Sequence, residues 1–405
     1  MIRTDEKQLC SGCGVCGLVC PKQCITFVPD LLGGLYAKVD EKECIECGAC
    51  EIVCPLQQSF NNTIIGEKAY VAFSSDKGIR FRGSSGGIFE TVASWIINQN
   101  GYVFACKLDS ELKLRMFEVS NLNEVREFTK SKYLQCDSIS SYQLIRTRIK
   151  QGKRVLVCST PCQISALSKY LGSLAQSDNL YLLDFFCHGV PSQIFFDKCR
   201  EYIERRDGIK VKGYEFRSKV NKGASPHYYS LTYEKNGENV RSTYLYLEDP
   251  FYLGFQKYIT LRDSCYHCPF GSGNHVGDLT LGDFHDIDKY IKGLNRFDGV
   301  STVIINSNKG FKIWKAIKDS LEIYEIDINQ LYSNHQIYTG GTKEPETREV
   351  FLRDLEMLPF DSVVKKWFNP KQEWKKAIYY RLPFPMRKIL KAISEKNDRG
   401  SIKCS

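Results

Sequence analysis

The pattern of apolar and polar positions is clearest in the middle of the chain. The stretch KRVLVCSTPCQISALSKYLG (153–172) begins with a short apolar run and continues, after a turn, with apolar residues at helical spacing. The stretch NLYLLDFFCHGVPSQIFFDKCREYI (179–203) repeats this order. Each stretch therefore predicts a strand, a turn and a helix. Two such units in succession predict neighbouring parallel strands, whose carboxyl ends commonly hold ligands.

Three further patterns extend this prediction along the chain. In FRGSSGGIFETVASWIINQNG (81–101), an apolar stripe at helical spacing predicts a helix whose end is followed by Gly101. The stripe consists of Ile88, Val92, Trp95 and Ile96. Alternating residues on both sides of Asn236-Gly237 predict a hairpin that adds antiparallel strands or a flap to the sheet. Residues 301–320 predict one more strand and helix. We therefore expect an α/β domain with a mixed sheet.

Composition and charge narrow the class of protein. The chain has 405 residues, of which 42% are hydrophobic and 25% charged, and its length predicts about two to three domains. It has no apolar signal-peptide core and no apolar run long enough for a membrane helix, so we expect a cytoplasmic protein. From Asp361 onward, nine Lys and three Arg face four acidic residues. This segment carries +8 of the net +9, and the near-neutral remainder argues against nucleic-acid binding.

The 18 cysteines carry the strongest chemical signal. Two copies of C-x-x-C-x-x-C-x-x-x-C-P begin at Cys10 and Cys44, and this spacing is typical of two 4Fe–4S clusters. The fourth cysteine of each run is expected to ligate the other cluster. A zinc site would leave the eight-cysteine repeat unexplained. The expected ligands are Cys10, Cys13, Cys16 and Cys54 for the first cluster, and Cys44, Cys47, Cys50 and Cys20 for the second.

A second group of cysteines lies in the body of the chain. Cys265 and Cys268 form a C-x-x-C, and two thiols do not complete a metal site. Cys162 and Cys187 follow the two predicted parallel strands, so these four cysteines are candidates for a third 4Fe–4S cluster. Four other cysteines compete for this role, although each is more often a small buried residue than a ligand. They are Cys106, Cys136, Cys158 and Cys199.

The segment Ser84-Ser85-Gly86-Gly87 stands at the start of the helix predicted after residue 87. Free backbone amides, small side chains and the helix dipole suit such a start to a phosphate group, and Arg80 and Arg82 lie nearby in the sequence. An ordinary serine cap explains the same residues. The residues alone leave both interpretations open.

Several short motifs occur together in one order along the chain. These are SSGG, SKY (Ser131, Lys132 and Tyr133), STPCQ, CHGVPS, the C-x-x-C and DLTLGDF. Between about residue 5 and about residue 340 the chain resembles the coenzyme F420 hydrogenase/dehydrogenase beta-subunit family, in the version with a fused two-cluster ferredoxin module.

The resemblance implies a set of cofactors and residues. Members of this family carry a flavin, usually FAD rather than FMN, beside a 4Fe–4S cluster. On this chain it implies that Cys162, Cys187, Cys265 and Cys268 hold the third cluster, and that Ser84, Ser85, Gly86, Gly87, Ser131, Lys132 and Tyr133 bind the flavin. The chain departs from the usual family motifs at Ser159 and at His285, where relatives have Gly and Trp. The second change puts the substrate pocket in doubt.

Other polar residues near the motifs have less certain roles. His188 and His267 neighbour proposed ligands and are candidates for hydrogen bonds to cluster sulfur, or are ordinary polar residues. Asp278 and Asp283 fix backbone turns or contact a flavin ribose, and the structural role is the expected one. No residue identifies itself as a catalytic acid or base.

We expect an α+β ferredoxin module (1–60), an α/β flavin and cluster domain with a mixed sheet (66–340) and a basic helical tail (341–405). Pro383 and Pro385 divide the tail into short helices. The tail suits a surface helix on the inner face of the membrane, a docking segment for a protein partner, or a solvated helix packed on the body.

The function expected from these observations is that of an iron–sulfur flavoprotein oxidoreductase. Electrons pass between a redox partner protein or small carrier and a small-molecule hydride donor or acceptor, which is a deazaflavin such as coenzyme F420 or another organic substrate. By analogy alone, the pathway is one of surface-polysaccharide synthesis. Two alternatives remain: a non-catalytic iron–sulfur subunit that needs a partner enzyme, and a redox sensor that binds nucleic acid through the tail.

Overall fold

The computed structural model describes residues 2, 6–57, 68–219, 228–284, 298–329, 331, 341–382, 386, 387 and 389. His285, Pro383, Pro385 and the last sixteen residues of the expected tail lie outside the described residues.

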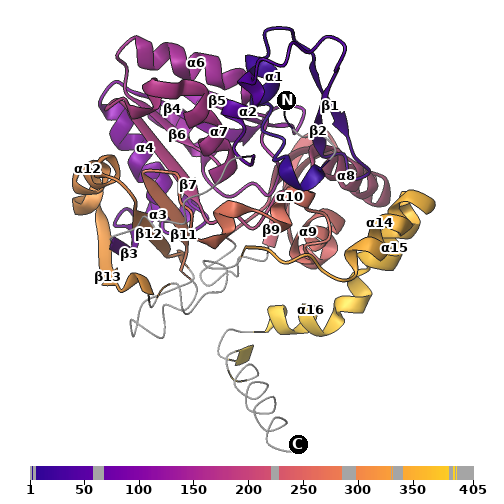
Figure 1. Cartoon of the computed structure of the whole chain (residues 1–405). Helices are drawn as coiled ribbons and strands as arrows, with labels where there is room; N and C mark the ends of the chain where they lie inside the picture. Colours follow the sequence, from indigo (N-terminus) through magenta and orange to yellow (C-terminus); the bar gives the residue numbers. More distant parts are fainter. Residues whose placement is uncertain are drawn as a thin grey trace, which may run out of the picture.

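A mixed sheet of eight strands forms the centre of the body, in the order β13-β3-β12-β11-β7-β6-β4-β5 (Figure 1). The four strands β11, β7, β6 and β4 run parallel, and antiparallel strands complete both sides. The mixed α/β sheet predicted from the sequence is therefore confirmed. The strands are β3 Lys68–Ser74, β4 Tyr102–Leu108, β5 Leu114–Val119, β6 Val155–Cys158, β7 Leu180–Phe185, β11 Leu279–Asp283, β12 Ser301–Ile305 and β13 Leu321–Ile326.

Helices cover both faces of this sheet because its central strands are apolar on both sides. Successive residues of β4 enter opposite cores, with Val103 in one and Phe104 in the other. The Val103 core is closed by α4 (Ile88–Asn98) and α12 (Asn308–Ile317), and the Phe104 core by α6 (Ile139–Lys150), α7 (Pro161–Leu171) and α8 (Gln193–Asp207). The strand–helix units predicted at 153–172, 179–203 and 301–320 are confirmed. The shorter helices of this region are α3 Lys77–Arg82, α5 Leu122–Phe128, α9 Pro250–Gln256 and α10 Asp263–Tyr266.

The predicted hairpin forms β9 (Tyr228–Lys235) and β10 (Glu238–Leu245), which turn at Asn236-Gly237 with positive φ at both residues. It pairs with β8 (Lys210–Glu215) in a separate three-stranded sheet. Of the two alternatives predicted for the hairpin, antiparallel strands added to the large sheet were therefore wrong, whereas a flap stays a prediction. The tyrosines of β8, β9 and β10 pack on one another, so aromatic contacts hold this second sheet together.

The N-terminal module contains a two-stranded sheet, β1 (Ile25–Pro29) and β2 (Leu35–Val39), and two short helices, α1 (Val15–Val19) and α2 (Ala49–Val53). Each helix begins after a glycine with positive φ, Gly14 at 80° and Gly48 at 74°. The two halves of the module thus follow the cysteine repeat of the sequence. Both helices pack against α7, which joins the module to the large domain.

The C-terminal helices are α14 (Arg348–Met357), α15 (Phe360–Trp367) and α16 (Trp374–Arg381). Phe351 and Phe368 are buried against Phe195 of α8, so α14 and the end of α15 belong to the core of the body. On α16, Trp374 and Ile378 are exposed. Within the described residues, no helix has the length and the apolar character that crossing a bilayer requires.

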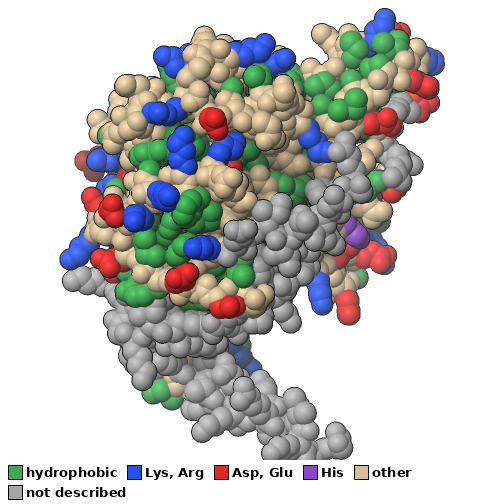
Figure 2. Space-filling view, turned by 60° about the vertical axis from the view of Figure 1, so that its left-hand side comes forward, with side chains coloured by type: hydrophobic (Ala, Val, Ile, Leu, Met, Phe, Trp, Pro, Cys, Tyr) green, Lys and Arg blue, Asp and Glu red, His purple; other side chains and the backbone are tan. Residues whose placement is uncertain are grey.

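Figure 2 shows one face of the body, where Lys and Arg side chains lie mainly over the upper and middle part and Asp and Glu side chains mainly toward the lower rim, with hydrophobic side chains between them. Both signs of charge therefore occur on this face.

Replacing Phe351 with alanine tests whether the C-terminal helices belong to the core. Loss of a buried phenylalanine costs about 3–5 kcal/mol of unfolding free energy. Val350 is 45% exposed on the same helix, so Val350→Ala is expected to change that free energy by less than about 0.5 kcal/mol. Denaturant unfolding under anaerobic conditions measures both. Equal effects of the two substitutions would contradict the packing described here.

Candidate functional site

The four cysteines predicted as ligands of the first cluster lie together. They are Cys10, Cys13, Cys16 and Cys54. Burial raises the pKa of the Cys16 thiol, and the nearby thiolates of Cys13, Cys10 and Cys54 raise it further. These thiols therefore lie within electrostatic range of one another, although Cys54 is 38 positions from Cys16 in the sequence. Cys16 lies within α1 and Cys54 directly follows α2, so the packing of the two helices brings them together.

The second set lines one hollow in the N-terminal module. Its wall also contains the apolar residues Ile25 and Val39 and the charged residues Lys22 and Glu46. Cys24 also lies in this hollow, with its Sγ 3.5 Å from the Sγ of Cys20. Cys24 stands outside the two C-x-x-C-x-x-C-x-x-x-C-P runs and is 7% exposed. The four predicted ligands that line the hollow are Cys20, Cys44, Cys47 and Cys50.

The third set gathers where the parallel strands end. Cys162 lies in the first turn of α7 after β6, and Cys187 follows β7. Cys265 lies in α10 and Cys268 follows that helix. Burial raises the pKa of the Cys187 thiol well above its usual value, and the thiolates of Cys265, Cys162 and Cys268 add to the rise. The fold thus brings together all four cysteines predicted for the third cluster.

These three sets differ from sites for a single metal ion. Among the described residues, no group of three or more His, Cys, Asp or Glu side chains is arranged to hold one ion. In a cubane cluster each thiolate binds a different iron, so the sulfurs stand farther apart than the ligands of one zinc ion. Backbone amides of Glu46 and Gly189 donate to the sulfurs of Cys44 and Cys187, each over 3.4 Å, as is usual around cluster thiolates.

Arg262 connects the first and third sets and was not recognised from the sequence. It is 3% exposed and precedes Cys265 by three positions. Its guanidinium donates to the carbonyl of Cys10 over 3.1 Å, to that of Leu35 over 2.8 Å, and to the side chain of Gln135 over 2.8 Å. Gln135 in turn donates to the carbonyls of Ser11 and Gly12. This network holds the first cysteine loop against the body.

The first and third sets approach each other at Cys13 and Cys162. Burial raises the pKa of the Cys13 thiol to about 12, and the thiolates of Cys162 and Cys10 contribute to the rise. Tyr142 of α6 is fully buried within range of both Cys13 and Cys162, and its hydroxyl donates to the carbonyl of Gln163 over 2.9 Å. The two sets are therefore neighbours, with Tyr142 beside them.

The residues that the resemblance assigns to a flavin come from two segments that touch. The backbone amide of Ser131 donates to Oγ of Ser84 over 2.6 Å. The Ser85 hydroxyl donates to the carbonyl of Val300, and the Gly86 amide donates to Oγ of Ser301. These serine and amide groups are therefore already bonded within the protein. Gly87 has a φ of 85° and precedes α4.

The remaining two residues of this set, Lys132 and Tyr133, are engaged differently. Lys132 Nζ donates to the carbonyls of Phe128 and Thr129, each over 2.7 Å. Burial lowers the pKa of Lys132 to about 7, although the nearby Cys158 thiolate opposes the shift. Tyr133 stacks on Phe255 with ring centroids 4.6 Å apart. Lys132 is thus near Cys158 at the end of β6, beside the turn that leads to Cys162.

Basic side chains surround the start of α4. Lys219 Nζ donates to the carbonyls of Ser85 and Arg80 over 2.9 and 2.7 Å. Burial lowers the pKa of Lys219 to about 7, and the charges of Arg217 and Arg80 lower it further. Arg217 pairs with Asp283. Arg82, by contrast, turns away to an ion pair with Glu90.

The structure also bears on the predictions for Asp278, His188 and His267. Asp278 accepts from the amide of Leu182 over 2.8 Å and from the Ser307 hydroxyl over 2.5 Å, which confirms its structural role. The His188 carbonyl accepts from Thr342, and Nδ1 of His267 lies 3.3 Å from the Asp263 carbonyl. The tuning role of the two histidines stays a prediction. His285, the substitution that bears on the substrate pocket, lies outside the described residues.

Asp184 is a structural residue that sequence reasoning missed. It is fully buried in β7, and its carboxylate accepts from the amides of Val276 and Gly277, each over 2.9 Å, and from the hydroxyl of Thr280. These bonds fix the segment that leads from the C-x-x-C to β11. The sequence signal that could have identified Asp184 is an aspartate within an otherwise apolar strand.

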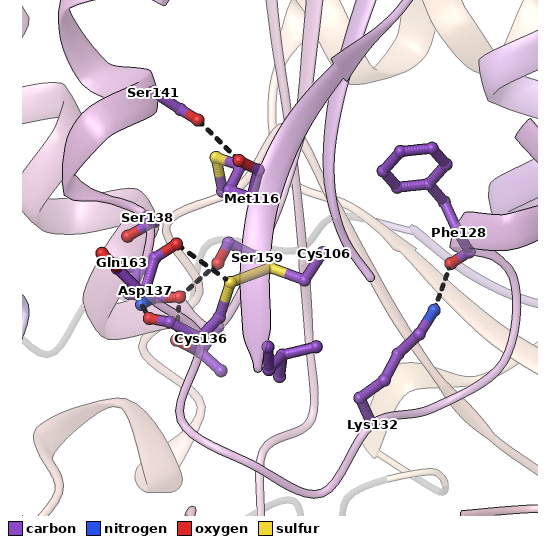
Figure 3. The surroundings of a disulfide bond; sticks show 12 residues. Cys106, Met116, Phe128, Lys132, Cys136, Asp137, Ser138, Ser141, Ser159 and Gln163 are labelled. Carbon is purple, nitrogen blue, oxygen red and sulfur yellow. Dashed lines mark hydrogen bonds between the residues drawn. A yellow bond between two sulfur atoms is a disulfide. The ribbon is translucent and has the colours of Figure 1, made fainter. Parts of the chain in front are cut away.

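Cys106 and Cys136, each expected to be a small buried residue instead of a ligand, form a disulfide that the sequence did not predict (Figure 3). Cys136 is buried and Cys106 is partly buried. Their separation of 30 positions in the sequence gave no paired spacing to detect. Cys199 agrees with its prediction as a buried residue within α8, at 1% exposure. Cys158 is the last residue of β6 and is partly buried.

Comparisons with known proteins agree with this arrangement. Residues 152–330 match the family of the coenzyme F420 hydrogenase/dehydrogenase beta subunit, C terminus, and residues 9–57 match a 4Fe–4S dicluster domain. The resemblance predicted from the motifs is therefore confirmed for both segments. No curated protein matches the chain. A chain in the structure of the F420-reducing NiFe hydrogenase complex from Methanosarcina barkeri is 17% identical, with a TM-score of 0.44, over 68% of this chain and 90% of that one.

Replacing Arg262 with glutamine tests the connection between the first cysteine loop and the body. Loss of hydrogen bonds from a buried charged group costs about 1–3 kcal/mol. We expect faster hydrogen exchange in residues 7–16 and 33–37, measured on the holoprotein by mass spectrometry. Arg148 lies at the far end of α6 and forms an ion pair with Glu118. Arg148→Gln removes this ion pair and is the matched control. Unchanged exchange in these two segments of the Arg262 variant would contradict the role given to this network.

Proposed function

We propose, on the premise that the chain joins a 4Fe–4S dicluster domain to a C-terminal domain of the F420 hydrogenase/dehydrogenase beta-subunit family, that it is an iron–sulfur flavoprotein oxidoreductase. It connects one-electron carriers with an organic substrate that gains or loses a hydride. The observation that carries the proposal is the gathering of twelve cysteines into three sets of four, two of which meet at Cys13 and Cys162.

The ligand assignment follows the three sets. We assign Cys10, Cys13, Cys16 and Cys54 to the first cluster, Cys20, Cys44, Cys47 and Cys50 to the second, and Cys162, Cys187, Cys265 and Cys268 to the third. Clusters of this type supply one-electron transfer. Cys16 is buried and the other seven cysteines of the first and third sets are partly buried, which limits the access of water. Backbone amides that donate to sulfur, such as that of Gly189 to Cys187, stabilise the negative charge of reduced clusters.

The groups at the proposed flavin site favour binding through the backbone and through cationic side chains over binding through serine hydroxyls. The hydroxyls of Ser84 and Ser85 are bonded within the protein, whereas the start of α4 supplies a helix dipole. Lys219 and Arg217 lie near this start, although burial lowers the pKa of Lys219 to about 7 and Asp283 pairs with Arg217. A bound flavin converts between one-electron and two-electron transfer. FAD, with its pyrophosphate, suits this arrangement of charges better than FMN does.

Lys132 is the residue that we propose as a proton donor beside the flavin. Its pKa of about 7 means that Nζ gains or loses a proton near neutral pH. Two backbone carbonyls hold Nζ in place, so the proton is held at a defined position. The stacking of Tyr133 on Phe255 fixes the neighbouring backbone.

Electrons reach the protein at the second cluster in this proposal. Cys47 is exposed, and Ile45 and Ile52 are 56% and 67% exposed beside it. An apolar surface around an exposed ligand suits brief docking of a redox protein or a small carrier. The path then leads through the first set to the third, because Cys13 and Cys162 are neighbours.

Three further points belong to the proposal. The division into residues 1–60, 66–340 and 341–405 corresponds to the electron-input module, the flavin body and a covering tail. The protein works in the cytoplasm, where its basic tail touches the membrane or a partner.

Coenzyme F420 or another organic compound, in a surface-polysaccharide pathway or elsewhere, is the hydride substrate. The alternative is a non-catalytic electron-transfer subunit, in which the same clusters serve a partner enzyme.

Cofactor content tests the proposal. Protein purified without oxygen is expected to contain about twelve irons, about twelve sulfides and one flavin per chain. Cys265→Ser is expected to remove about four irons, whereas Cys199→Ser, which changes a buried cysteine outside the three sets, is expected to remove none. About eight irons without flavin would contradict the proposal. Reoxidation by a small-molecule acceptor alone would favour the enzyme over the non-catalytic subunit.

A further inference from the structure

The Cys106–Cys136 disulfide lies at the same edge of the sheet as the third cysteine set. Cys106 is in β4, which runs parallel to β6 with Phe104 paired to Val157. Cys106 therefore lies two residues farther along, beside Ser159 and the turn that leads to Cys162. Figure 3 shows the disulfide next to Ser159 and Gln163.

Hydrogen bonds connect the other half of the disulfide to two proposed clusters. The carbonyl of Cys136 accepts from Nε2 of Gln163 over 2.6 Å, and Gln163 directly follows Cys162. Gln135, which precedes Cys136, donates to the carbonyls of Ser11 and Gly12 over 3.0 and 2.9 Å. Cys136 thus contacts Gln163, in the helix turn that carries Cys162 of the third set. Its neighbour Gln135 contacts the first cysteine loop.

Backbone pairing holds both halves of the disulfide in place without the sulfur–sulfur bond. Cys106 pairs with Met116 of β5. The Asp137 amide donates to the Leu114 carbonyl, and the Met116 amide donates to the Asp137 carbonyl, each over 2.9 Å. The two Cα atoms lie 6.5 Å apart. Two thiols formed by reduction would remain neighbours, so the bond could form again without a large movement of the chain.

We propose that Cys106 and Cys136 form a redox-active dithiol/disulfide site that the third cluster reduces. Two electrons, delivered one at a time through the third cluster from a low-potential one-electron carrier, and two protons from solvent break the bond and give two thiols. Cys106 is only partly buried, which lets protons reach it. The site stores two electrons beside the cluster.

The inference rests on the proposed function, since the clusters supply the electrons. It adds a two-electron site made only of this chain's own residues. The segment that ends at Cys136 also carries Ser131, Lys132 and Tyr133. The state of the disulfide therefore alters the constraint on the loop to which we assign the flavin.

The test follows the disulfide and the clusters in the same sample. Anaerobically purified holoprotein is reduced in steps with a reduced viologen, and cluster reduction is followed by visible absorbance. Each step is stopped with acid, free thiols are alkylated, and the Cys106–Cys136 linked peptide is quantified by mass spectrometry. We expect the linked peptide to disappear as the clusters are reduced, with two electrons consumed per chain beyond those taken up by the clusters and flavin.

Matched variants separate cluster-dependent reduction from direct attack by the dye. Cys268→Ser removes the third cluster without touching the Gln163 contact, and is expected to keep the linked peptide. Cys199→Ser changes a buried cysteine outside the three sets, leaves every cluster in place and is expected to lose the linked peptide as the unmodified protein does. Cys265→Ser replaces Cys268→Ser if the latter does not fold.

Two results would overturn the inference while leaving the proposed function intact. In the first, the linked peptide persists after the clusters are reduced, which makes the disulfide purely structural. In the second, it is lost equally fast without the third cluster. A preparation that lacks iron altogether would instead refute the proposed function, and the inference with it.

Discussion

The buried guanidinium of Arg262 is the constraint on which the arrangement of the cysteines depends. Its hydrogen bonds to Cys10, Leu35 and Gln135 join three segments that are far apart in the sequence. A charge at 3% exposure needs hydrogen-bond partners. Both Nη atoms of Arg262 have them, whereas its Nε has none within the part of the chain that the structure describes, so these segments can assemble around the guanidinium in few ways. The ring of Tyr36, 4.3 Å from the guanidinium, covers it further. This contact holds the N-terminal module where its first cysteine set meets the third.

The large sheet supplies the second part of the arrangement. Parallel strands bring successive loops to one edge, and Cys162 and Cys187 follow β6 and β7 there for this reason. Asp184 then fixes the approach of the chain to β11 from the C-x-x-C segment. One edge thus collects the third cysteine set, the Cys106–Cys136 disulfide and the segment with Lys132. The electron transfer that we propose between one-electron and two-electron sites needs such proximity, and the topology provides it.

The sequence predicted the parts of this arrangement that follow from local spacing. The eight N-terminal cysteines, the strand–helix units and the hairpin at Asn236-Gly237 each have a short-range pattern, and the structure contains all of them. Spacing alone left the third set open, because Cys162 and Cys265 meet only after the sheet has formed. The disulfide, the role of Arg262 and the separate sheet of the hairpin were missed for the same reason. Each depends on which distant segment lies opposite, and periodicity carries no information about that.

The most direct test of the account is the electron paramagnetic resonance spectrum of the fully reduced protein. Neighbouring reduced clusters interact magnetically, so the account predicts a spectrum broadened by coupling between the first and third clusters. In Cys265→Ser this coupling is expected to vanish and leave the spectrum of the two N-terminal clusters alone. A wild-type spectrum equal to the sum of isolated clusters, with no change in line shape in the variant, would contradict the proximity of the two sets.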